Sequence, residues 1–196
     1  MNTRGQNALP MTDDSFLVAR ALKGDRKAFE MIVRKYEQPL TSYLGRMTGE
    51  REAALDFAQE VFLKVYCSLA SYRPAYKFST WLFKIASNHL IDHWRKKRLP
   101  TVSLDQPVDD DEGPLLPQVA DPGPSVVRKF ELAEIRRKIE RALETVPEAL
   151  RELFILRHVN EFSYEEIADI KGLPVGTVKN RVFQAKELLR KRMEPS

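Results

Sequence analysis

The sequence predicts an all-α protein made of two small helical domains joined by a flexible linker. Apolar residues recur at helical spacing in two long blocks, and no stretch alternates apolar and polar residues as a half-buried strand does. A proline-rich stretch separates the blocks. The predicted organisation is an N-terminal tail (residues 1–12), a first domain (13–98), the linker (99–126) and a second domain (127–196).

Four helices are predicted in the first block. We expect Ser15 to cap the first helix and Gly24 to end it, and we expect Pro39 to bend the second helix before Gly49 stops it. The second, third and fourth helices are predicted at about residues 26–47, 50–69 and 78–97, with a short loop at 71–77. Cys67 is the single cysteine, so an internal disulfide is excluded, and we expect it to be a half-buried packing residue on the third helix.

The charge of the chain is unevenly distributed. Six acidic residues and no basic ones lie between Pro100 and Pro124, so a net charge of +4 for the whole chain leaves +10 for the remainder. Two basic regions on either side of an acidic connector suit a partner with a negatively charged backbone. Solvated helix faces are the alternative explanation.

The second block predicts two helices and then a helix-turn-helix. The first two helices span about 127–146 and 147–156, since proline is tolerated at Pro147 in a first turn. Ser163 and Glu166 form a Ser-x-x-Glu capping box that starts a helix ending near Lys171. The turn Gly172-Leu173-Pro174 leads into a last helix over residues 175–193.

The last helix is predicted to have one buried stripe and one polar, basic face. Val178, Val182, Ala185 and Leu189 form the stripe, and the helix carries six basic residues against one acidic residue. Its polar face suits the DNA major groove, because Lys, Arg, Asn and Gln bond base edges or phosphates and a phenyl ring can touch a thymine methyl. The candidate DNA-binding residues on it are Thr177, Lys179, Asn180, Arg181, Phe183 and Gln184.

These motifs resemble those of extracytoplasmic-function sigma factors. The segment SYEEIADIKGLPVGTVKNRVFQAKELLR resembles their fourth region, which reads the −35 promoter element. The segments GDRKAFEMIVRKYEQPL, DFAQEVFLKVYCSLASY and FSTWLFKIASNHLIDHWRKKR resemble their second region. Asn180 stands where the family often has Ser and Gln184 where it often has Arg, so the −35 sequence cannot be borrowed from a relative.

The resemblance implies a promoter-specificity subunit of RNA polymerase that needs no cofactor. It implies that the first domain binds the clamp coiled coil of the largest polymerase subunit through Asp56, Gln59, Glu60 and Phe62. A core position for Phe62 is the alternative. It further implies contact with the polymerase flap, binding to promoter DNA and control by an anti-sigma factor.

The resemblance also places recognition and melting of the −10 element in the first domain. Unpaired bases stack on aromatic rings while their backbone follows a basic groove, and an amide such as that of Asn88 can bond the edge of an extruded base. Trp81 is either a melting wedge or a core residue. The candidate −10 residues are Tyr72, Arg73, Tyr76, Lys77, Phe78, Trp81, Lys84, Asn88 and Arg95.

Other classes of function are less well supported. No signal-peptide run and no long apolar stretch occurs, so we expect a cytoplasmic protein without membrane insertion. His89 and His93 lie four residues apart, but no third metal ligand is evident. No nucleotide-binding or nucleophile motif suggests an enzyme. The rival readings are a helix-turn-helix regulator that acts without polymerase and an adaptor or anti-sigma-like interaction protein.

Overall fold

The computed structural model describes residues 13–98 and 126–193, and within these ranges the chain is helical without a strand. The all-α prediction is therefore confirmed. We call the first group of helices the N-terminal bundle; its members are α1 (Asp13–Leu22), α2 (Arg26–Thr48), α3 (Arg51–Ser68), the 3-10 turn η1 (Leu69–Ser71) and α4 (Phe78–Arg98). The second group is the C-terminal bundle, made of α5 (Val126–Glu144), α6 (Glu148–His158), α7 (Tyr164–Lys171) and α8 (Val175–Met193). The predicted tail and linker lie outside the described residues, except for Val126, which begins α5.

The local signals in the sequence set most helix ends. Gly24 and Gly49 adopt φ values of 89° and 79°, a left-handed conformation that stops a helix, and the Asp25 side chain caps α2 by accepting a hydrogen bond from Ala28 N. One expectation fails, since Ser15 is the third residue of α1 and not its cap. Helix α2 runs from Arg26 to Thr48 with Pro39 inside it.

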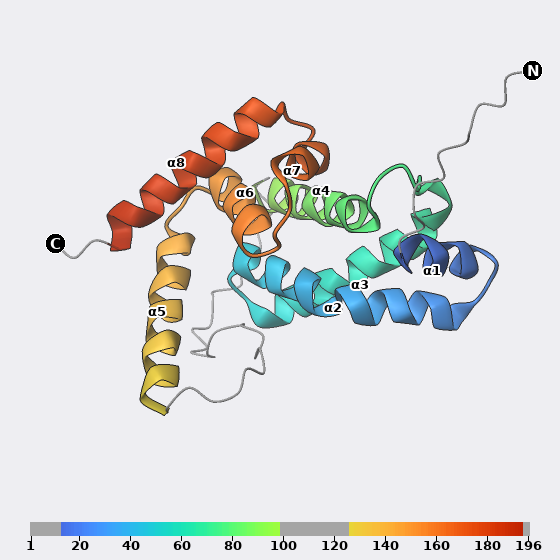
Figure 1. Cartoon of the computed structure of the whole chain (residues 1–196), viewed down its shortest axis with the longest axis horizontal. Helices are drawn as coiled ribbons and strands as arrows, with labels where there is room; N and C mark the ends of the chain where they lie inside the picture. Colours follow the sequence, from blue (N-terminus) through green and yellow to red (C-terminus); the bar gives the residue numbers. More distant parts are fainter. Residues whose placement is uncertain (1–12, 99–125, 194–196) are drawn as a thin grey trace, which may run out of the picture.

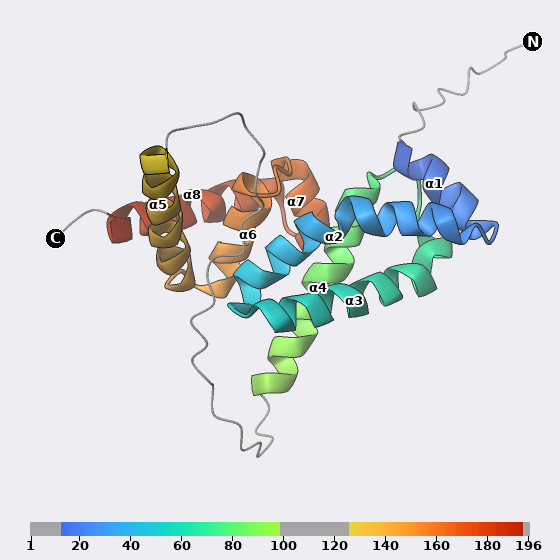
Figure 2. The same ribbon diagram turned by 90° about the horizontal axis from the view of Figure 1, so that it is seen from below.

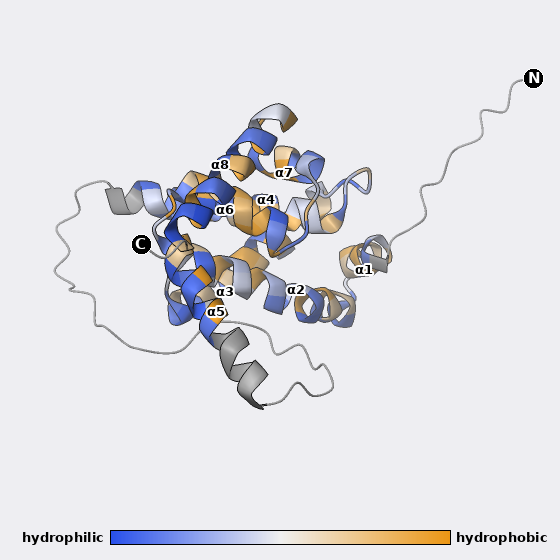
Figure 3. Ribbon diagram, turned by 60° about the vertical axis from the view of Figure 1, so that its left-hand side comes forward, coloured by the Kyte–Doolittle hydropathy of each residue, from blue (hydrophilic) through white to orange (hydrophobic). Residues whose placement is uncertain are grey.

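The N-terminal bundle buries an aliphatic core between α2, α3 and α4. Ile32, Leu40, Val61 and Leu82 are all fully buried there. Figure 2 shows α4 crossing α2 and α3, and Figure 3 shows hydrophobic and hydrophilic residues on different sides of the helices. Cys67 is exposed, contrary to expectation, because it lies about 200° around the helix from the buried Val65.

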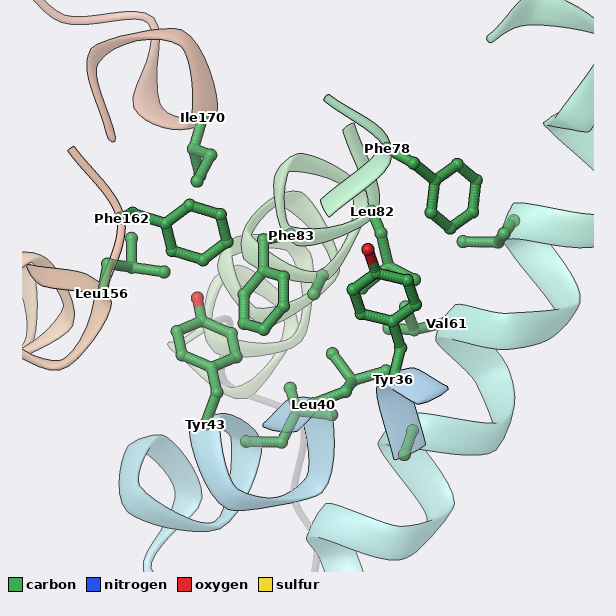
Figure 4. Packing of buried hydrophobic residues seen from close by; sticks show 14 of the residues in the cluster. Tyr36, Leu40, Tyr43, Val61, Phe78, Leu82, Phe83, Leu156, Phe162 and Ile170 are labelled. Atoms are coloured by element: carbon green, nitrogen blue, oxygen red, sulfur yellow. The ribbon is translucent and has the colours of Figure 1, made fainter. Parts of the chain in front are cut away.

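The two bundles pack against each other. The rings of Phe83 on α4 and Phe162, just before α7, meet edge to face with centroids 4.9 Å apart, and Leu156 and Ile170 point toward the same place (Figure 4). In Figure 1 helix α7 lies beside α4, which agrees with the contacts between these two helices. One continuous apolar cluster therefore includes residues of both bundles. A smaller cluster joins α5 to α8.

A buried carboxylate lies in the seam between the bundles. Glu152 on α6 is 2% exposed and accepts hydrogen bonds from Tyr43 of α2 (2.8 Å), Ser87 of α4 (2.7 Å) and Lys171 of α7 (2.6 Å). Burial, with the adjacent Glu152 charge, raises the pKa of the Tyr43 hydroxyl well above its usual value, so Tyr43 remains a donor. A buried charge is tolerated only when it is paired and hydrogen-bonded in this way. The bundles consequently meet in a defined orientation.

The described residues contain no helix long and apolar enough to cross a membrane.

Candidate nucleic-acid interface

The helix-turn-helix predicted at the C-terminus is present. Ser163 Oγ accepts a hydrogen bond from Glu166 N (3.1 Å) while Glu166 Oε2 accepts one from Ser163 N (2.7 Å), which completes the capping box at the start of α7. Gly172 ends α7 at a φ of 63°, so the chain turns sharply before α8. The turn fixes the direction in which α8 leaves the bundle.

Helix α8 has the two faces that its sequence predicts. Val178, Val182, Ala185 and Leu189 are at most 5% exposed. The remaining faces carry Thr177 and Arg181, which are half-buried, and the exposed side chains of Lys179, Asn180, Phe183 and Gln184. The structure therefore brings the six predicted −35 residues together on one solvent-accessible helix.

The exposed part of α8 combines amide side chains, cationic side chains and one exposed aromatic ring. Gln184 Nε2 lies 3.4 Å from Asn180 Oδ1, so the two amides are neighbours, and Lys179 Nζ lies 5.6 Å from the centre of the Tyr164 ring. Phe183 is 61% exposed on this otherwise polar face. Such a set of donors, acceptors and apolar surface matches what base edges present in a major groove.

The loop before α4 differs from the prediction in how it uses its rings. Tyr72 and Phe78 are 7% and 1% exposed, and they pack with Trp81 at centroid distances of 5.3–5.6 Å. Tyr76 is 55% exposed. Of the three loop rings expected to stack on bases, only Tyr76 is thus available at the surface, while Trp81 is half-buried.

The polar residues predicted for the −10 element lie mainly at the surface. Asn88 is exposed on α4, and the cationic residues Arg73, Lys77, Lys84 and Arg95 are exposed as well. Arg95 forms an ion pair with Asp92 (3.3 Å). Exposed cations and an exposed amide are the kinds of groups that contact a single-stranded backbone and an extruded base.

Lys77 connects this loop to the helix-turn-helix. Its Nζ lies 2.8 Å from Glu166 Oε1 in the other bundle. Burial raises the pKa of the Glu166 carboxyl, but hydrogen bonds from Lys77 and Ser163 outweigh it, so the pKa lies below its usual value. Glu166 is therefore ionised at neutral pH and pairs with a residue that the sequence assigns to DNA.

The predicted polymerase-binding residues share a face of α3 with exposed apolar side chains. Asp56, Gln59 and Glu60 are exposed, and Leu63 is 65% exposed beside them. A groove of about 380 Å³ runs between this face and α2. Phe62 is only 9% exposed and belongs to the core cluster, so it contributes an edge of the groove and not a free ring.

The two histidines of α4 pack on α3. His89 is 8% exposed, its Nδ1 lies 2.6 Å from Lys64 Nζ, and both His89 and His93 meet the Phe57 ring edge to face. Burial, followed by the charge of Lys64, lowers the pKa of His89, so it is neutral and accepts from the lysine. Among the described residues no three potential metal ligands converge.

Sequence reasoning missed Glu152. It lies on α6 between the apolar residues Leu150 and Leu153, and a lone Glu there resembles a surface residue. Its placement one turn before the buried Leu156 was the available signal. Its partners are distant in sequence, and no local pattern reveals them.

Comparison with known proteins finds a family-model match in each half of the chain. Residues 32–99 match the family model for Sigma-70 region 2, and residues 136–189 match that for Sigma-70 region 4. The RNA polymerase sigma-H factor of Pseudomonas aeruginosa is 32% identical over 191 residues, covering 95% of this chain and 97% of that protein. The ECF RNA polymerase sigma-E factor of Escherichia coli K12 is 34% identical over 186 residues, covering 93% and 95%.

Solved structures share the fold. The sigma factor RpoE of Bartonella quintana in complex with the anti-sigma factor NepR has a TM-score of 0.66 at 22% identity, covering 85% of this chain and 97% of that one. CnrH in complex with the cytosolic domain of CnrY has a TM-score of 0.65 at 22% identity, covering 91% and 95%.

Proposed function

The chain belongs to the extracytoplasmic-function sigma factors of the sigma-70 family, and from this premise we propose how its two bundles divide promoter recognition. A sigma factor binds core RNA polymerase and directs initiation at promoters, so the protein is a DNA-binding initiation factor and not an enzyme. We assign −10 recognition and polymerase binding to residues 13–98 and −35 recognition to residues 127–196.

Helix α8 would read the −35 element. The observation that carries this assignment is the separation of its faces: four side chains at most 5% exposed hold the helix on the bundle, and Lys179, Asn180, Phe183 and Gln184 face solvent. The N-terminal part of a recognition helix is the part that contacts base edges in helix-turn-helix proteins. These four residues lie in that part of α8.

Helix α4 and the loop before it would hold the −10 element. Asn88 would bond the edge of an extruded base, because an amide donates and accepts at once. Tyr76 would stack on an unpaired base, and Arg73, Lys77 and Lys84 would follow the phosphates. Tyr72 and Phe78 would support this surface from below.

The exposed face of α3 would bind polymerase. Leu63 supplies apolar area at its centre, with Asp56, Gln59 and Glu60 as polar neighbours, which is the usual composition of a protein interface. We further propose that the protein works in the cytoplasm with polymerase. We also propose that an anti-sigma factor controls it, since the structurally similar RpoE of Bartonella quintana is bound to the anti-sigma factor NepR.

Run-off transcription with core polymerase, the purified protein and a genomic promoter library tests the proposal. We expect transcripts with defined starts that disappear when the protein is left out. The free protein should bind duplex promoter DNA weakly, because each bundle offers a small surface. Tight sequence-specific binding without polymerase and no specific start would instead favour a regulator that acts alone.

A further inference from the structure

Helix α1 contributes a buried carboxylate to the N-terminal bundle. Asp14 is 9% exposed and accepts hydrogen bonds from the Tyr36 hydroxyl (2.7 Å) and from Lys35 Nζ (2.6 Å), both on α2. The Lys35 side chain is 43% exposed, whereas Tyr36 is 8% exposed. The bond between Asp14 and Tyr36 is therefore the protected one. Asp14 lies outside the segment that matches Sigma-70 region 2, which begins at residue 32, whereas Tyr36 lies within it.

The Tyr36 ring packs against Phe78, at the end of the loop before α4. Its centroid lies 5.6 Å from that of Phe78, and Figure 4 shows the two rings on the same side of the core. Phe78 in turn packs on Tyr72 at 5.3 Å, and the Tyr72 hydroxyl donates to the backbone oxygen of Tyr76 (2.8 Å). A continuous series of contacts thus joins α1 to the backbone of the loop.

Each member of this series is fixed by its neighbours. A hydrogen bond from a tyrosine hydroxyl to a carboxylate fixes the position of the tyrosine ring in the core. A ring packed edge to face then limits the orientations of the ring beside it. Burial and the bond to Asp14 raise the pKa of Tyr36, so the donor remains protonated. Because close-packed interiors transmit small displacements, the position of Tyr36 sets that of Phe78 and Tyr72.

We propose that Asp14 and Tyr36 are positioning residues for −10 recognition, which they serve by fixing the aromatic support under residues 72–77. This inference rests on the proposed role of that loop in binding the −10 element. Neither side chain touches DNA: Asp14 and Tyr36 are buried, and the groups offered to DNA are Arg73, Tyr76 and Lys77 above them. To discriminate among bases, the side chains of the loop must already be held in position before a base binds.

The test compares Tyr36→Phe, which removes only the hydroxyl, with Lys35→Met, which removes the partly exposed ion pair and leaves the Asp14–Tyr36 bond. Each variant is assembled with core polymerase on a promoter found by run-off transcription. Opening is followed by permanganate reactivity of −10 thymines, and selectivity by transcription from a −10 substitution panel. Binding of the holoenzyme to a −35 duplex serves as the internal reference.

We expect Tyr36→Phe to lower −10 opening by about three- to tenfold, less than the full effect of one hydrogen bond to a charged group because only part of it reaches the loop, and to compress the ranking of −10 bases. Polymerase binding and −35 binding should not change, and Lys35→Met should behave like the parent protein. Asp14→Asn, which keeps an oxygen acceptor, should fall between the two. It supplies the same comparison if Tyr36→Phe does not fold.

A Tyr36→Phe variant that melts at a lower temperature but keeps both opening and the −10 ranking would overturn the inference, because the bond would then serve stability alone. Tyr76→Ala and Arg73→Ala separate this result from a failure of the proposed function. If these two variants lose −10 selectivity while Tyr36→Phe keeps it, only the positioning role is wrong. If they too keep it, the loop does not bind the −10 element.

Discussion

Asn88 is the side chain on which −10 recognition is expected to depend most. It is exposed on α4, directly before the buried His89, so the helix holds it firmly while the amide remains free to meet a base. Asn88→Ala should leave folding and polymerase binding intact but remove selectivity at one −10 position. A −10 substitution panel measures this loss, and Gln184→Ala, which removes an exposed amide from the other bundle, is the control.

Three residues of α8 should separate base reading from phosphate binding. Lys179→Ala and Gln184→Ala should each cost about 1–3 kcal/mol at particular −35 positions, the range of one good bidentate base contact. Arg190, which pairs with Glu187 at 3.1 Å near the end of α8, should contact phosphate, so Arg190→Ala should weaken all sequences alike. Holoenzyme binding to a set of −35 duplexes measures the difference. Uniform losses for all three variants would mean that another face of α8 meets DNA.

Residue-level prediction succeeded where a helix period decided exposure. The stripe on α8 follows from spacing alone, so the exposed positions of Lys179 and Phe183 could be predicted. It failed for Tyr72 and Phe78, since an irregular loop has no period that tells an inward ring from an outward one. The sequence shows that rings are present there but not which of them the core uses.

The short helix α7 depends on its cap. Eight residues form few internal hydrogen bonds, so the reciprocal bonds between Ser163 and Glu166 are a large part of its local stability. Ser163→Ala should destabilise the protein by about 1 kcal/mol. Denaturant unfolding measures the change, and Ser163→Asp, which keeps an oxygen acceptor, should restore most of it. An unchanged midpoint for Ser163→Ala would show that packing alone holds α7.

Elements with strong end signals were predictable to within a few residues. The capping box and Gly172 located α7, and Gly49 located the end of α2. Pro39 lies within α2 as predicted, because a proline removes one hydrogen bond but does not end a helix whose residues on both sides are buried, as Ile32, Tyr36, Leu40 and Leu44 are. Tertiary burial outweighs a local breaker there.

The docked arrangement of the bundles cannot serve both promoter elements at once. Lys171 Nζ lies 2.7 Å from Ser87, the neighbour of Asn88, and α8 has 19 residues. At 1.5 Å per residue α8 is about 28 Å long, so the two reading surfaces lie within roughly 40 Å. About 25 base pairs separate a −35 from a −10 element, or roughly 85 Å at 3.4 Å per step. If α4 and α8 read these elements as proposed, the bundles have to separate on the promoter.

The hydroxyls that cross the seam should govern this separation. Tyr43→Phe combined with Ser87→Ala leaves Glu152 paired with Lys171 but removes three hydrogen bonds across the seam, two accepted by Glu152 and one donated by Lys171 to Ser87. Each lost bond should favour the separated state by about 1.5–3 kcal/mol. Small-angle scattering of the free protein should show a larger radius of gyration. Ser71→Ala, which removes a hydroxyl that bonds the Ser68 carbonyl within the N-terminal bundle, is the control and should leave the radius of gyration unchanged.

The division into two helical halves could be predicted, but their contact could not. A stretch rich in proline and glycine shows where a connector lies. The hydrogen bond between Lys171 and Ser87 joins positions 84 residues apart, and no periodic pattern in the sequence indicates it. The same holds for Phe83 and Phe162, whose contact merges two expected cores into one. Long-range pairing of surfaces depends on shape, which hydrophobic patterning does not encode.

If Lys77 binds a −10 phosphate as proposed, its ion pair with Glu166 would make the promoter an effector of the protein's own conformation. The single positive charge of Lys77 would not fully neutralise a phosphate and Glu166 together, so −10 DNA and the seam would compete for one ammonium group. Thermodynamic linkage makes such competition reciprocal: the factor by which separation raises affinity for the −10 strand is the factor by which that strand favours separation. A sequence that binds the loop more tightly would thus also hold the molecule open for longer.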